Sequence, residues 1–147
     1  EKSGYITDDR GCAGGLENEA KFVILGDLNA DPCDGDGLRE GICGLLGHRR
    51  VQDVRPVSEG AAEASAVQGG VNREHKGPAR QDTYQSAPGQ APGNLRLDYV
   101  LPSAGLAVIK AGVFWPPAAD PLSGLTAGPP YVSSDHRLVF AEIEIAE

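Results

Sequence analysis

The sequence predicts an α/β fold for this chain of 147 residues, on the evidence of its apolar patterning. Residues 22–25 (Phe-Val-Ile-Leu) are a short run of β-formers, which is typical of a strand buried on both faces. Residues 95–101, 106–115 and 137–145 also favour strands, and the first and last of these alternate between apolar and polar side chains. Residues 38–46 carry apolar side chains at helical spacing, so helices and strands are both expected.

Local signals place the helices and the loops between them. Asp36 is positioned to cap the first helix, and Gly47 is expected to end it. The Ala-rich residues 59–68 favour a second helix. Residues 69–93 are polar with scattered Gly and Pro, which predicts one long loop, and loops of that length are often functional.

Net charge, apolar runs and cysteine spacing argue against several classes of protein. The formal net charge of −8 argues against tight, non-specific nucleic-acid binding by this chain alone. No apolar run approaches the roughly 20 residues of a membrane-spanning helix. Cys12, Cys33 and Cys43 form no Cys-x-x-Cys pair, so a zinc site is unsupported, while both free thiols and a disulfide from Cys12 stay open. Loop-rich composition and cysteines favour a secreted or periplasmic protein, although the compartment is not fixed.

Three polar motifs stand at the edges of the expected strands. Asp27 and Asn29 follow the first strand two residues apart, so they project into one space at the end of the sheet. Asp98 lies within a strand, where a carboxylate is unfavourable unless it is paired or solvated. Asp135 and His136 precede the last strand, and this pair suits metal ligation or proton transfer. Taken singly, each motif also fits an ordinary turn or a cross-strand ion pair.

In this order, the motifs resemble the C-terminal half of the endonuclease/exonuclease/phosphatase superfamily, which includes DNase I-like and exonuclease III-like enzymes. The motifs are Gly26-Asp27-Leu28-Asn29, Leu97-Asp98-Tyr99-Val100-Leu101 and Ser134-Asp135-His136. The resemblance implies the C-terminal half of a two-sheet α/β sandwich with mostly antiparallel or mixed strands and long loops. Residues 1–20 would then be a leader loop and residues 21–147 a partial domain, whose missing N-terminal half supplies the main metal-binding Glu.

The resemblance also implies roles for the site residues. Asp27 handles a proton of the attacking water or of the leaving group, and Asn29 positions the phosphate or Asp27. Asp98 bonds to the imidazole of His136 and holds its tautomer, so that His136 contacts the phosphate. Asp135 and Asp27 lie at a divalent metal, for which Mg²⁺ or Mn²⁺ suits the carboxylate ligands.

The implied activity is hydrolysis of phosphodiester bonds by a metal-assisted water, with a site that is incomplete in this chain. The alternatives are a phosphomonoesterase or lipid or inositol phosphatase of the same fold, and a non-catalytic binding or assembly fragment. The expected partners are a phosphate-ester substrate, either nucleic acid or a small or lipid phosphate, and a cover for the apolar sheet face. We expect the missing N-terminal half or another copy of the chain to cover that face around Val139 and Ile143.

Overall fold

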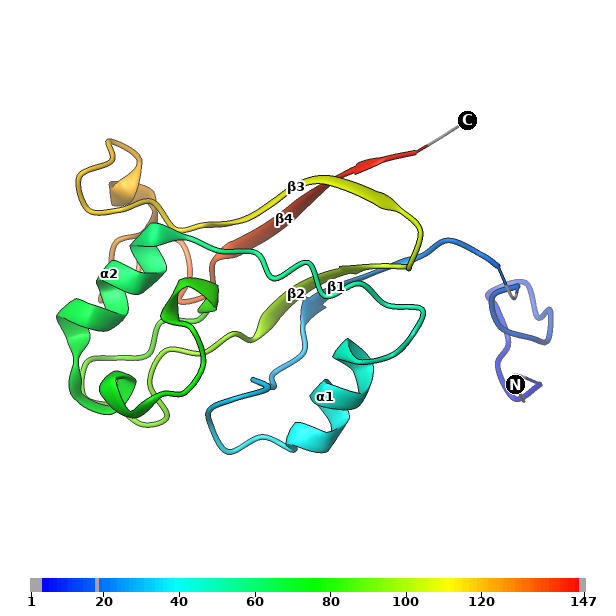
Figure 1. Ribbon diagram of the computed structural model, residues 1–147, viewed down its shortest axis with the longest axis horizontal. Helices are drawn as coiled ribbons and strands as arrows, with labels where there is room; N and C mark the ends of the chain where they lie inside the picture. The colour runs from blue at the N-terminus through cyan, green and yellow to red at the C-terminus, as the bar shows by residue number, and fades with distance from the viewer. Residues whose placement is uncertain (1–3, 18, 146–147) are drawn as a thin grey trace.

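The computed structural model describes residues 4–17 and 19–145 and confirms a mixed α/β fold (Figure 1). Three 3-10 turns, Gly70–Glu74, Ala79–Gln81 and Ser123–Thr126, interrupt the loops. The regular elements are β1 (Val23–Asp27), α1 (Arg39–Leu46), α2 (Glu59–Gln68), β2 (Asp98–Pro102), β3 (Ala107–Phe114) and β4 (Leu138–Glu144).

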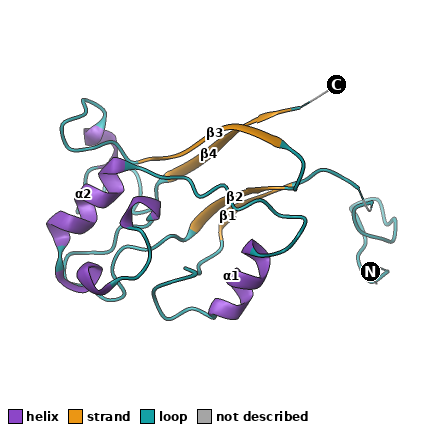
Figure 2. Ribbon diagram, in the orientation of Figure 1, coloured by secondary structure: helices purple, strands orange, loops and turns teal. Residues whose placement is uncertain are grey.

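The described strands form two antiparallel ladders, β1 with β2 and β3 with β4 (Figure 2). In the first ladder Val23 lies opposite Pro102 and Asp27 lies opposite Asp98, so the two aspartates share one end. The second ladder pairs Phe114 with Leu138 at its own end. Each described sheet therefore has two strands, and the larger two-sheet sandwich that the resemblance implies stays a prediction.

Two small apolar clusters hold the ladders to the helices. In one, Ile42 of α1 packs against Tyr99 and Leu101 of β2, and all three side chains are buried. In the other, Ala61 of α2 packs against Val113 and Trp115. The approach of α2 requires a glycine at position 60, because a Cβ there would lie 2.1 Å from the carbonyl oxygen of Trp115.

The prediction that the first strand is buried on both faces is wrong. The side chain of Leu25 is 70% exposed and that of Val23 is 39% exposed, whereas Ile24 packs against the cluster under α1. Ile24 faces the cluster under α1, whereas Val23 on the opposite face only borders a pocket that it shares with Ala107 and Ile143. A continuous apolar run cannot distinguish a strand covered once from a strand covered twice.

The helix predictions are mostly confirmed. The second helix spans residues 59–68 as expected, and Gly47 follows the last residue of α1. The expected cap at Asp36 is wrong, because α1 begins at Arg39 and its N-cap residue is Leu38, whose side chain makes no capping bond. Leu38 is 83% exposed, so it lies outside the packed stripe of this helix.

The exposure of β4 differs between its two faces. Val139 is half-buried against the cluster of Ala61, Val113 and Trp115, whereas Leu138 on the other face is 68% exposed. Whether a second chain or a further segment covers either face stays a prediction.

Two further sequence expectations concern cysteines and membranes. All three cysteines are free thiols, and only Cys33 is half-buried. Burial, together with the charges of Asp31 and Asp34, raises the pKa of the Cys33 thiol.

Among the helices of the described residues, none has the length and apolar character needed to cross a bilayer.

Candidate active site

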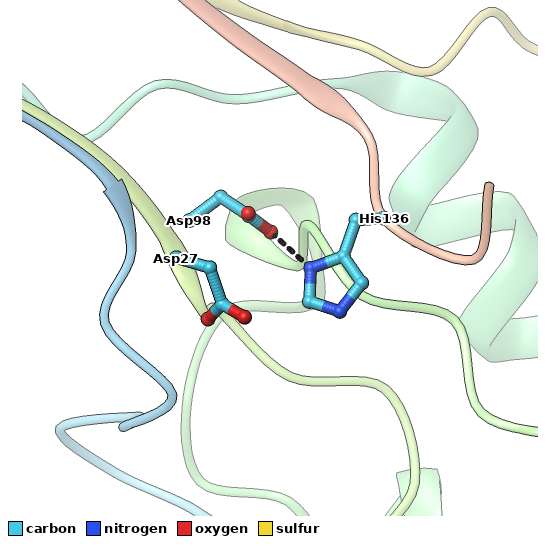
Figure 3. Close-up of side chains that lie close together, drawn as sticks. All are labelled: Asp27, Asp98 and His136. Atoms are coloured by element: carbon cyan, nitrogen blue, oxygen red, sulfur yellow. Dashed lines mark hydrogen bonds and ion pairs between the residues drawn. The ribbon is translucent and has the colours of Figure 1, made fainter.

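Three polar side chains from distant parts of the sequence meet at one end of the β1–β2 ladder. Asp27 is the last residue of β1 and Asp98 is the first residue of β2, and their pairing places them opposite each other. His136 precedes β4 and is brought alongside by an isolated bridge to Tyr84. One potential ligand atom from each of Asp27, Asp98 and His136 lies within 4.8 Å of the others, and Figure 3 shows the side chains pointing toward one another.

The imidazole of His136 is oriented by Asp98. Its Nδ1 lies 2.9 Å from Oδ2 of Asp98, with the His136 and Asp98 side chains 30% and 17% exposed (Figure 3). A carboxylate at Nδ1 fixes the tautomer and leaves Nε2 available to another group. The ring of Tyr84 lies beside the imidazole, with the ring centroids 5.2 Å apart, and limits its movement on that side.

Thr83 holds Asp98 in place, and no signal in the sequence indicated this role. Its buried hydroxyl donates to Oδ2 of Asp98 at 2.8 Å. The hydroxyl oxygen of Thr83 also accepts the backbone N–H groups of Leu97 and Asp98, at 3.0 and 2.9 Å. A single threonine in a polar loop has no distinguishing pattern, so only its approach to β2 in three dimensions reveals this role.

Asn29 hydrogen-bonds to the carboxylate of Asp27. Its backbone N–H donates to Oδ1 of Asp27 at 2.8 Å, and its side-chain amide lies 3.5 Å from Oδ2. Asn29 has a φ of 51°, in the left-handed region that asparagine tolerates better than most residues. The turn therefore needs a residue of this kind both for its backbone and for its contact with Asp27.

Asp135 is the exception among the predicted site residues. Its backbone carbonyl accepts the N–H of Gln85 at 2.8 Å, which fixes the chain just before His136. Its carboxylate does not belong to the group formed by Asp27, Asp98 and His136. The structure thus brings Asp27, Asp98 and His136 together, with Asn29 bound to Asp27, while the metal-ligand role of Asp135 stays a prediction.

A pocket of about 310 Å³ adjoins the cluster, and Asn29, Tyr84 and His136 contribute to its walls. Asp31 and Asp34 also line it, but their carboxylates already accept backbone N–H groups. These bonds fix the shape of the loop after β1. The pocket provides space for an organic group next to the cluster.

The donor set is compatible with a divalent cation. Asp27 is exposed and can present carboxylate oxygens, and Asp98 keeps one oxygen free of the bonds to Thr83 and His136. Carboxylate oxygens are the ligands that Mg²⁺ prefers in proteins. The imidazole of His136 is already bonded to Asp98 through Nδ1, so it is better suited to contact a substrate than to bind magnesium.

Comparison with protein families identifies the class to which this arrangement belongs. The chain belongs to the Endonuclease/Exonuclease/phosphatase family, whose sequence model matches residues 4–136. The match extends into residues 4–20, which lie outside the three motifs that carry the resemblance. Members of this family generally hydrolyse phosphoester bonds, and they commonly use divalent metals. Searches among curated proteins and among solved structures found no match.

Proposed function

We propose that the site formed by Asp27, Asp98 and His136 hydrolyses phosphodiester bonds with the help of a bound Mg²⁺ or Mn²⁺. The observation that carries the proposal is the meeting of these three side chains, with His136 and Asp98 2.9 Å apart, in a member of a family that hydrolyses phosphoesters. Acid–base groups and a phosphate-contacting imidazole are what an attack by water on phosphorus requires.

The contacts assign a task to each residue. Asp27 is exposed and fixed by Asn29, so it can take a proton from the attacking water or deliver one to the leaving oxygen. His136 contacts a phosphoryl oxygen through Nε2, since Nδ1 is bonded to Asp98. Asp98 stays bonded to Thr83 and His136 and so keeps the imidazole in one orientation.

Asp27 and Asp98 are the residues that would hold the cation, with Asp135 as the further ligand expected from the motif. A bound divalent ion would supply neutralisation of charge on the phosphoryl oxygens. The chain's own contribution is to hold the carboxylates and the imidazole at fixed positions before substrate arrives.

For substrate, the acidic net charge of −8 favours a small or lipid phosphate ester over a long nucleic acid. The pocket beside His136, at about 310 Å³, is the size of a compact organic group, which supports the same choice. We also propose that another copy or a further segment covers the sheet face around Val139 and Ile143. Leu25 and Leu138 are exposed apolar side chains that such a cover could also reach.

A substrate panel tests the hydrolase proposal. Bis-p-nitrophenyl phosphate, p-nitrophenyl phosphate and plasmid DNA are offered with Mg²⁺, with Mn²⁺ and with a chelator. The family match over residues 4–136 reaches beyond the three motifs, so we expect turnover by this chain instead of the incomplete site that the motifs alone imply. The expected results are metal-dependent turnover of the diester, and losses of about 100-fold or more in Asp27→Asn and His136→Ala. Asp9→Asn, at an exposed carboxylate away from the cluster, is the matched control and keeps full activity.

The outcomes separate the candidate activities. Turnover restricted to p-nitrophenyl phosphate replaces the diesterase proposal with a phosphomonoesterase. Wild-type protein that is inert on all three substrates with either metal overturns the hydrolase proposal and leaves a binding role. Turnover that survives both Asp27→Asn and His136→Ala shows that the chemistry lies elsewhere.

A further inference from the structure

We propose that Arg137 is a positioning residue of this site, whose buried guanidinium fixes the loop carrying Asp135 and His136. The proposal rests on the function proposed above, because it assigns a role in the same reaction. Arg137 touches no reacting group and acts through its neighbour His136. Its hydrogen bonds and its backbone connection to Thr83 support this role.

The guanidinium joins three separate segments of chain. Nη1 donates to the carbonyl oxygen of Ser134, and it lies 3.4 Å from that of His136. Nη2 donates to the carbonyl oxygen of Thr126 at 3.0 Å and to the side-chain oxygen of Gln85. Arg137 is only 3% exposed, so these bonds are shielded from water and replace its hydration.

Gln85 extends this arrangement around the loop. Its backbone N–H donates to the carbonyl oxygen of Asp135 at 2.8 Å, and its carbonyl oxygen accepts the hydroxyl of Tyr131 at 2.7 Å. The chain on both sides of His136 is therefore tied to Arg137 or to Gln85. Any movement of the imidazole away from Asp98 would require several of these bonds to break together.

The backbone of Arg137 closes the connection to Asp98. Its N–H donates to the carbonyl oxygen of Thr83 at 2.7 Å, and the hydroxyl of Thr83 donates to Asp98. Asp98 in turn bonds to His136, which precedes Arg137 in the chain. Covalent and hydrogen-bonded links thus join Arg137, Thr83, Asp98 and His136 in a closed ring. The guanidinium of Arg137 holds the part of this ring that lies in the loop before β4.

Arg137 has no carboxylate partner among the described residues. Its guanidinium stacks on Trp115, 4.5 Å from the ring centroid. Its Nε is buried without a hydrogen-bond partner. The charge of Asp135 acts on the guanidinium from the same loop, without a direct ion pair. The planar group therefore contributes mainly by bridging the carbonyl groups of this loop.

Arg96 provides a matched comparison within the same chain. It is also 3% exposed and also stacks on an aromatic ring, with its guanidinium 4.5 Å from the centroid of Tyr99. It differs in forming an ion pair with Asp53 instead of bridging the carbonyls of the loop before β4. Removing either side chain disturbs the interior, but only Arg137 holds the segment around His136.

The experiment compares Arg137→Met, Arg137→Lys and Arg96→Met, all in the full chain. NMR at one fixed pH follows the Nδ1–H proton of His136, and kinetics follow bis-p-nitrophenyl phosphate with Mg²⁺. For Arg137→Met we expect loss of the Nδ1–H resonance and a decrease in kcat by about 10-fold or more, while KM changes by less than about 3-fold. The compact ammonium group of lysine lacks the planar fork that reaches acceptors in separate segments. We therefore expect Arg137→Lys to keep less than half of the kcat that Arg137→Met loses.

Arg96→Met is expected to unfold more easily than wild type while keeping the His136 resonance. An Arg137→Met protein that is folded and keeps the resonance overturns the proposal, as does full recovery with lysine. If Arg137→Met does not fold, Gln85→Ala removes one acceptor of the guanidinium and must weaken the resonance. An inert wild type contradicts the hydrolase proposal alone, because the NMR comparison still decides the role of Arg137.

Discussion

The hydroxyl of Thr83 donates to Asp98 at 2.8 Å, on the same carboxylate oxygen that is bonded to the imidazole of His136. With two donors on one oxygen, the carboxylate is held against rotation before any substrate arrives. Thr83 thus links the loop before β2 to the candidate chemistry. The orientation of His136 depends on a hydroxyl group that lies 53 positions earlier in the chain.

Replacing Thr83 with valine keeps the shape of the side chain but removes its hydroxyl. The N–H groups of Leu97 and Asp98 then lose their acceptor in a buried region. Because each unsatisfied buried group costs about 1–3 kcal/mol, we expect Thr83→Val to lower the free energy of unfolding by about 2–4 kcal/mol. Urea denaturation measures this loss. Thr83→Ser keeps the hydroxyl and is expected to lose less than about 1.5 kcal/mol, so equal losses in the two variants would contradict this account.

The stability of the chain is expected to fall between about pH 4 and pH 7 because of Asp82. Burial raises the pKa of this carboxyl from 3.8 to about 7, against a hydrogen bond from Ser65 that lowers it. Across this interval the folded state holds a proton that the unfolded state has released, so the free energy of unfolding decreases as pH rises. The full effect is up to about 4 kcal/mol, and it is complete once the pH passes the folded-state pKa.

Asp82→Asn isolates this contribution, since asparagine can still accept the Ser65 hydroxyl but carries no titrating proton. The difference in unfolding free energy between variant and wild type, measured by denaturation from pH 4 to pH 8, is expected to grow in favour of the variant. Other carboxylates affect both proteins equally and cancel in this difference. If the difference in unfolding free energy stays constant from pH 4 to pH 8, folding does not raise the pKa of Asp82.

Much of the fold follows from local sequence signals. The Ala-rich stretch formed α2 at the expected residues, and the strands after residue 95 lie close to their expected places. What local pattern could not supply is which faces are covered. The run ending at Leu25 is as apolar as a fully buried strand, yet the neighbours that decide its exposure come from other parts of the chain.

The candidate site shows the same division. Asp27 and His136 were predictable because polar groups next to strand ends are conspicuous in the sequence. Asp98 was predictable because a carboxylate inside an expected strand is unusual, although β2 in fact begins at this residue. Thr83 and Arg137 were not, because a threonine in a loop and an arginine at the start of a strand have many ordinary explanations. Their roles depend on hydrogen bonds between segments 15 to 52 residues apart, which only the folded chain displays.

Asp53 forms ion pairs with the buried Arg96 and with the exposed Arg55. We expect only the pair with Arg96 to contribute measurably to the free energy of unfolding. Arg96 is 4% exposed in its side chain, whereas Arg55 is 70% exposed. Burial alone would raise the pKa of Asp53, but the hydrogen bond and charge of Arg96 outweigh it, so the pKa is lowered. The pair therefore stabilises the fold at neutral pH, and its contribution is lost as pH falls through the lowered pKa.

Asp53→Asn leaves the guanidinium of Arg96 buried without a carboxylate and is expected to cost about 3–5 kcal/mol at pH 7. Arg55→Ala removes an exposed partner and is expected to cost less than about 1 kcal/mol. Urea denaturation at pH 7 and again at acidic pH checks both the size and the sign. A cost of Asp53→Asn that is unchanged in acid would mean that the pair contributes little through its charge.

Leu101 and Leu25 lie on neighbouring strands and differ strongly in exposure, which allows a direct test of which face of the first ladder is covered. Leu101 is fully buried, so Leu101→Ala is expected to lower the free energy of unfolding by about 2–5 kcal/mol. Leu25 is 70% exposed, and Leu25→Ala in dilute protein is expected to change it by less than about 0.5 kcal/mol. Denaturation at two protein concentrations measures both. If Leu25→Ala is as costly as Leu101→Ala and the cost rises with concentration, the side chain is buried by a second copy, because a self-associating face stabilises the fold by mass action.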